Sequence, residues 1–132
     1  MGARSLNRVQ FTMERDVVRI FGRGTGAAAA DMTAVKGKGI STAATAIDQT
    51  GTGLYTITLT DKWAGLLMFS GMVIDANSVD DWEVVVVAES VATNKTISIA
   101  TFKGGAAANL STDEKLLFEI VVSNTASLPQ GF

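Results

Sequence analysis

The sequence predicts a mainly β fold, an antiparallel β-sandwich or barrel of the jelly-roll kind, preceded by an extended or partly helical N-terminal arm. Apolar and polar residues alternate with a period of two in several segments. Clusters of turn residues separate these segments, and the single proline, Pro129, interrupts none of them. Because 132 residues suffice for one domain, we divide the chain into a basic arm, residues 1–16, and a single β-sandwich domain, residues 17–132.

The arm allows two interpretations. On a helix, apolar residues recur every three or four positions on the side opposite the arginines, which is an amphipathic pattern. As a strand, the segment VQFTMER alternates apolar and polar side chains. We expect an irregular or partly helical arm through about Arg15, followed by a first strand over about residues 17–23.

The strand pattern is clearest from residue 54 onward. In LYTITLT, residues 54–60, large apolar side chains alternate with threonines, and KTISIATF, residues 95–102, repeats the alternation. WEVVVVAE, residues 82–89, and KLLFEIVVS, residues 115–123, are apolar on both faces, which predicts strands at the centre of the core or at a subunit contact. The predicted turns are DQTGTG, DANSVDD, SVATN and KGGAAANLSTDE.

Composition restricts the chemistry. The chain has no cysteine and no histidine, which removes disulfides, thiolate metal sites and histidine-based catalysis. It is 47% hydrophobic and 18% charged, with a mean hydropathy of +0.28, so part of its surface is expected to be buried against other subunits. We expect no enzyme activity and no cofactor.

Charge is distributed unevenly. All five arginines lie in the first 23 residues, against two acids, whereas the remainder carries six lysines against eleven acids. A basic terminus binds either nucleic acid or an acidic protein surface; because apolar residues accompany the arginines, we expect a protein partner and consider nucleic acid unlikely. The predicted contact residues are Arg4, Leu6, Arg8, Val9, Phe11, Met13, Arg15, Arg19 and Arg23.

Three segments resemble ligand-binding motifs without meeting their requirements. FGRGTGAAAA, residues 21–30, has glycines spaced G-x-G-x-G and lacks the following helix of a dinucleotide site; we interpret it as a flexible loop. KGKGIST lacks the hydroxyl residue that follows the P-loop lysine. DANSVDDWE lacks the glycine and the final glutamate of a calcium loop, so we predict a solvated turn and no metal site.

Three segments in the middle of the chain form a recognisable series of strands and turns: VKGKGIS at 35–41, GTGLYTITLTDKWAGLLMFSGMVID at 51–75 and KTISIATFKGGAAANLSTDEKLLFEIVVSNT at 95–125. This series resembles small virion structural proteins of tailed bacteriophages. The resemblance implies a capsid decoration or cement protein, made in the host cytoplasm and located on the capsid surface of the virion. The implied partners are the major capsid protein and other copies of this chain, as a homotrimer.

Two other function classes stay open. A carbohydrate- or receptor-binding module would use loops at residues 75–82 and 103–113, with Trp82 as a sugar platform. An enzyme is the weaker alternative because acid–base groups are so few. The longest apolar run, residues 66–74, is far too short to span a membrane, so we expect no membrane partner.

Overall fold

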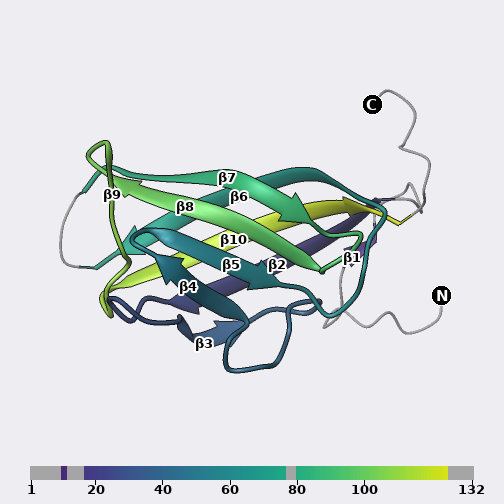
Figure 1. Ribbon diagram of the computed structural model, residues 1–132, viewed down its shortest axis with the longest axis horizontal. Helices are drawn as coiled ribbons and strands as arrows, with labels where there is room; N and C mark the ends of the chain where they lie inside the picture. The colour runs from purple at the N-terminus through teal and green to yellow at the C-terminus, as the bar shows by residue number, and fades with distance from the viewer. Residues whose placement is uncertain (1–9, 12–16, 77–79, 125–132) are drawn as a thin grey trace.

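Two antiparallel sheets pack face to face in the computed structural model, which describes residues 10–11, 17–76 and 80–124 (Figure 1). The first sheet has the order β1-β2-β10-β6, with β3 also paired to β2. Its strands are β1 (Gln10–Phe11), β2 (Val17–Thr25), β3 (Thr33–Lys36), β6 (Gly65–Asp75) and β10 (Glu114–Ser123). The β-sandwich prediction is confirmed.

The second sheet has the order β4-β5-β8-β7, with β9 also paired to β8. Its strands are β4 (Ile47–Gly51), β5 (Leu54–Thr58), β7 (Trp82–Ser90), β8 (Thr96–Lys103) and β9 (Ala106–Ala107). In Figure 1 this sheet lies over the first, and the edge strands β6 and β7 run side by side. The described residues form no helix.

The core lies between the sheets and follows the predicted alternation. Tyr55 and Ile57 of β5 are at most 1% exposed, and so are Ile97 and Ile99 of β8. Thr101, the next inward residue of β8, is fully buried and donates its hydroxyl hydrogen to the carbonyl of Ala108 at 2.6 Å. A buried hydroxyl is tolerated here because it is hydrogen-bonded.

One strand prediction and one turn prediction need correction. β10 is central, between β2 and β6, as its apolar pattern predicts. β7 is an edge strand of the second sheet, so its run of valines does not reflect a central position. The predicted turn DQTGTG is also partly wrong, because β4 occupies Ile47–Gly51 and only the residues between β4 and β5 form the turn.

The loop predicted for FGRGTGAAAA holds only from Gly26 onward, and the two earlier glycines are strand residues. Gly22 and Gly24 lie within β2, where a methyl group at Gly22 would lie 2.4 Å from Cζ of Phe118. Neither glycine has a positive φ, in contrast to Gly104 and Gly105 in the turn between β8 and β9. The first pair provides space for neighbouring side chains, and the second pair provides left-handed backbone for a two-residue hairpin.

The arm joins the first sheet at β1. Gln10 pairs with Arg19 and Phe11 with Val18. At these two positions the arm is therefore a strand, as in the second of its two interpretations. β2, which follows, begins at Val17 as predicted. The other arm residues lie outside the described part of the chain.

Candidate functional site

The outer face of the first sheet carries exposed apolar side chains. Met72 of β6 pairs with Leu117 of β10, which pairs in turn with Arg23 of β2. Met72 is 61% exposed and Phe21 is 50% exposed. We call this set the apolar patch; its members are Phe21, Met68, Met72, Ile74 and Leu117. Exposed apolar side chains gathered on one face indicate a contact surface.

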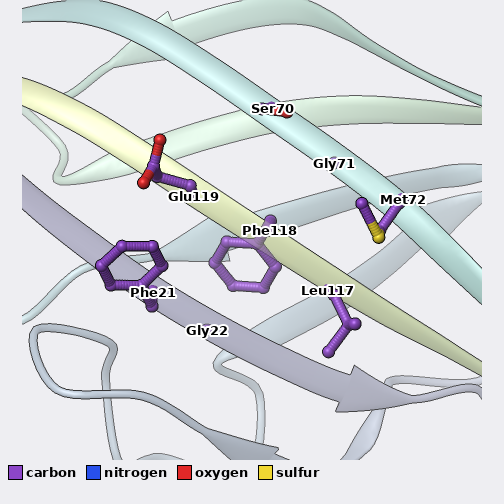
Figure 2. Close-up of a pocket in the computed structure, with 8 residues that line it drawn as sticks. All are labelled: Phe21, Gly22, Ser70, Gly71, Met72, Leu117, Phe118 and Glu119. Carbon is purple, nitrogen blue, oxygen red and sulfur yellow. The ribbon is translucent and has the colours of Figure 1, made fainter.

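A depression of about 330 Å³ lies within the apolar patch. Phe118 and its cross-strand neighbours Gly22 and Gly71 line its floor, while the ring of Phe118 packs on Phe69 on the core side of the sheet. Figure 2 shows the side chains around it, which come from β2, β10 and β6: Phe21, Leu117, Glu119, Ser70 and Met72. Its lining offers few polar groups, so it suits an apolar side chain better than a polar ligand.

The charges on this face are mostly positive. Arg19 forms an exposed ion pair with Glu119 at 3.5 Å. Arg23, Lys36 and Lys115 lie on the same face, and no carboxylate of the described residues forms an ion pair with them. The described residues of this face therefore carry a net charge of about +3 at neutral pH, from four cations and one acid.

The outer face of the second sheet is apolar at its centre and acidic at two edges. Leu54 of β5 pairs with Ala100 of β8, which pairs with Val85 of β7. Leu54 is 40% exposed and Val85 is 38% exposed. Asp48 of β4 and Glu83 of β7 share this face, since their cross-strand partners Thr56 and Phe102 also face outward. No lysine or arginine of the described strands lies on it.

The side chain of Trp82 interacts with neighbouring residues of the same domain. It is half-buried against the core, and its Nε1–H donates to Oδ2 of Asp75 at 3.0 Å. Nζ of Lys103 lies 5.7 Å from the ring centroid and 2.8 Å from Oδ2 of Asp80. This carboxylate raises the pKa of Lys103. Because Lys103 lies over the indole, the site gives no support to the sugar-platform alternative.

Asp31 and Asp48 form a hydrogen-bonded carboxyl pair. The N–H of Gln49 donates to Oδ1 of Asp31 at 2.8 Å and lowers the pKa of Asp31. The hydrogen bond with Asp31 raises the pKa of Asp48. These opposite directions are those of a pair in which the protonated carboxyl of Asp48 bonds to the ionised carboxyl of Asp31, whereas two ionised neighbours would repel.

Replacing Asp48 with asparagine should stabilise the fold at pH 7. The raised pKa of Asp48 means that the folded state holds more protons just above pH 3.8, so the contribution of Asp48 to stability falls as pH rises through its folded pKa. The lowered pKa of Asp31 has the opposite effect below pH 3.8. Asp48→Asn keeps a donor for Asp31 at every pH, so we expect a higher Tm at pH 7 and little change near pH 4.

The measurement is thermal unfolding at both pH values, with Asp113→Asn as a control that removes the same charge from an exposed turn residue. An equal shift in Tm at pH 4 and pH 7 for Asp48→Asn would refute this account of the carboxyl pair.

Two of the nine predicted contact residues have described side chains. Arg19 and Arg23 lie on the outer face of β2, on the same side as the apolar patch. Phe11 is described only as part of the backbone of β1. The remaining six lie outside the described residues: Arg4, Leu6, Arg8, Val9, Met13 and Arg15.

Sequence reasoning missed the apolar residues of β6. Its run GLLMFSGMVID contains two alternating sets, one facing the core through Phe69 and Val73 and one facing outward through Met68 and Met72. A predicted strand whose two alternating sets are both apolar is the signal that could have identified this surface, because only one of the two sets can face the core.

Comparisons with protein-family models, with curated proteins and with solved structures find no match for this chain. Within the described ranges, no group of three or more acidic, cysteine or histidine side chains is placed to hold a metal ion. In the same ranges, no helix has the length and apolar character needed to cross a membrane.

Proposed function

We propose that this chain is a non-enzymatic structural protein of a bacteriophage virion, which decorates and stabilises the capsid by binding across capsid subunits. The observation that carries the proposal is the exposure of large apolar side chains on the outer faces of both sheets. Such surfaces are costly in water and favourable in contact with another protein. The resemblance of about residues 17–125 to phage virion proteins supports the choice of the capsid as the assembly.

The arm supplies the contact with the shell. It carries three of the five arginines, Arg4, Arg8 and Arg15, and β1 ties it to the edge of β2. A short anchored segment with apolar residues between its cations can bind in a groove between subunits, with ion pairs at its margins. Each contact need only be weak, because capsid symmetry repeats it many times.

Reversing two arm charges should weaken capsid binding. We expect Arg4→Glu combined with Arg8→Glu to reduce binding about tenfold or more, since two ion-pairing cations become repelling acids. Binding is measured by co-sedimentation of the purified chain with empty shells of the phage that encodes it. The matched control is Lys38→Glu combined with Lys62→Glu, the same charge change on exposed body residues.

The control should bind like the unmodified chain, and binding of the unmodified chain should fall at high salt because exposed ion pairs are screened. If both double variants lose affinity equally, net charge accounts for binding and the arm has no special role. If the unmodified chain does not bind the shells at all, the proposed function is wrong.

A further inference from the structure

We propose that copies of this chain associate head to tail, with the outer face of the first sheet of one copy packed on the outer face of the second sheet of the next. This contact is formed by the isolated protein and does not depend on the capsid. It goes beyond the proposed function, because it assigns a partner and an orientation to both sheet faces.

Apolar exposure on both faces provides the attraction. On the first sheet, Met72 is 61% exposed, and Met68 and Ile74 are each 47% exposed. On the second sheet, Leu54 and Val85 form the apolar centre. Packing one set on the other would remove both from water, and the depression beside Met72 offers room for a side chain of the opposite face.

Charge identifies a second copy as the occupant. The outer face of the first sheet, here called the first face, carries Arg23, Lys36 and Lys115 in addition to the Arg19–Glu119 pair. The outer face of the second sheet, here called the second face, carries Asp48 and Glu83, with no cation among the described strand residues. A contact between unlike faces therefore brings cations to carboxylates. A contact between two first faces, or between two second faces, brings like charges together and is disfavoured.

The two faces lie on opposite sides of the sandwich, which determines the kind of assembly. A contact between unlike faces leaves one face of each kind free at the ends of a pair of copies. Further copies then add until a ring closes or an open chain grows. The inference thus requires three or more copies and excludes a two-fold dimer through either face.

Complementary variants provide the test. Met72→Asp places a carboxylate in the first face, and Val85→Asp places one in the second face, each at a position exposed in the single copy. Burying an unpaired carboxylate in an apolar contact is unfavourable. Light scattering should show each variant alone at the mass of one chain, 13.8 kDa. Every contact needs one intact face of each kind, and in a single variant all copies have the same face damaged.

An equimolar mixture should contain particles of twice that mass. The Val85→Asp copy retains an intact first face and the Met72→Asp copy an intact second face, so one contact can form and growth stops there. A head-to-tail contact predicts this restoration, whereas a contact between like faces does not. Thr52→Asp, in the exposed turn between β4 and β5, is the charge control and should keep the mass of the unmodified protein.

Three results would overturn the inference: an unmodified protein of one or two copies, single variants that keep the unmodified mass, or a mixture that stays at the mass of one chain. Circular dichroism confirms that each variant is folded. If an aspartate variant does not fold, Met72→Thr and Val85→Thr replace the pair, since threonine suits a strand and still removes apolar area. Loss of capsid binding alone would leave this inference intact, because no shell is present in the experiment.

Discussion

Phe118→Ala is expected to lower the free energy of unfolding by about 3 to 5 kcal/mol, the usual cost of removing a buried phenylalanine ring. Phe118 is 5% exposed, and its ring stacks on Phe69 with centroids 5.9 Å apart. Its neighbours on both adjacent strands, Gly22 and Gly71, have no side chain that could fill the space. The loss should appear in chemical denaturation as a lower midpoint with an unchanged slope.

A double-mutant cycle with Gly22→Ala shows whether the ring explains the glycine. In the unmodified protein, a methyl group at Gly22 would lie 2.4 Å from the ring, so Gly22→Ala should destabilise. In the Phe118→Ala background the ring is absent and the same methyl should be neutral or stabilising. If the effects of Gly22→Ala and Phe118→Ala on stability simply add, the glycine is not required to make room for the ring.

Gly26→Ala is expected to cost about 3 kcal/mol, near the upper end for overpacking. A methyl group there would lie 2.2 Å from the carbonyl oxygen of Ser111 and 2.5 Å from the carbonyl carbon of Leu110. Both are backbone atoms, and Leu110 is held by its N–H donation to the hydroxyl of Tyr55 at 2.9 Å. Relief would require the segment before β10 to move, which disrupts this buried contact.

Thermal unfolding measures the effect of Gly26→Ala, with Gly65→Ala as the control. No atom lies within 4 Å of a methyl group at Gly65, and its φ is not positive. The control should therefore change stability by less than about 1 kcal/mol. Similar losses for the two variants would mean that the close approach at Gly26 is not responsible.

Alternation made β5, β8 and β10 predictable from the sequence. In each strand one set of side chains is buried between the sheets, so the period of two directly reports the buried face. The position of a strand within its sheet was less accessible. β7 is as apolar as β10 and yet lies at an edge. Its valines lie on both the inner face and the exposed outer face, so its composition alone does not distinguish an edge strand from a central one.

Gly22 of β2 and Gly26, which follows the strand, show a second limit of sequence reasoning. Both resemble residues of a flexible loop, but their role depends on atoms distant in the sequence, at Phe118 and Ser111. The charges on the two faces show the same limit. Arg23, Lys36 and Lys115 are far apart in the chain and meet only through the register of β2, β3 and β10. Such features require the pairing of strands to be known.

The proposed structural role in a phage shell is tested most directly by quantitative mass spectrometry of virus particles purified from cells that produce this chain. The account predicts that the chain is present in a fixed ratio to the major capsid protein, of the order of one copy per capsid subunit, after repeated purification. Absence from the purified particles, or a trace amount that varies between preparations, would contradict it.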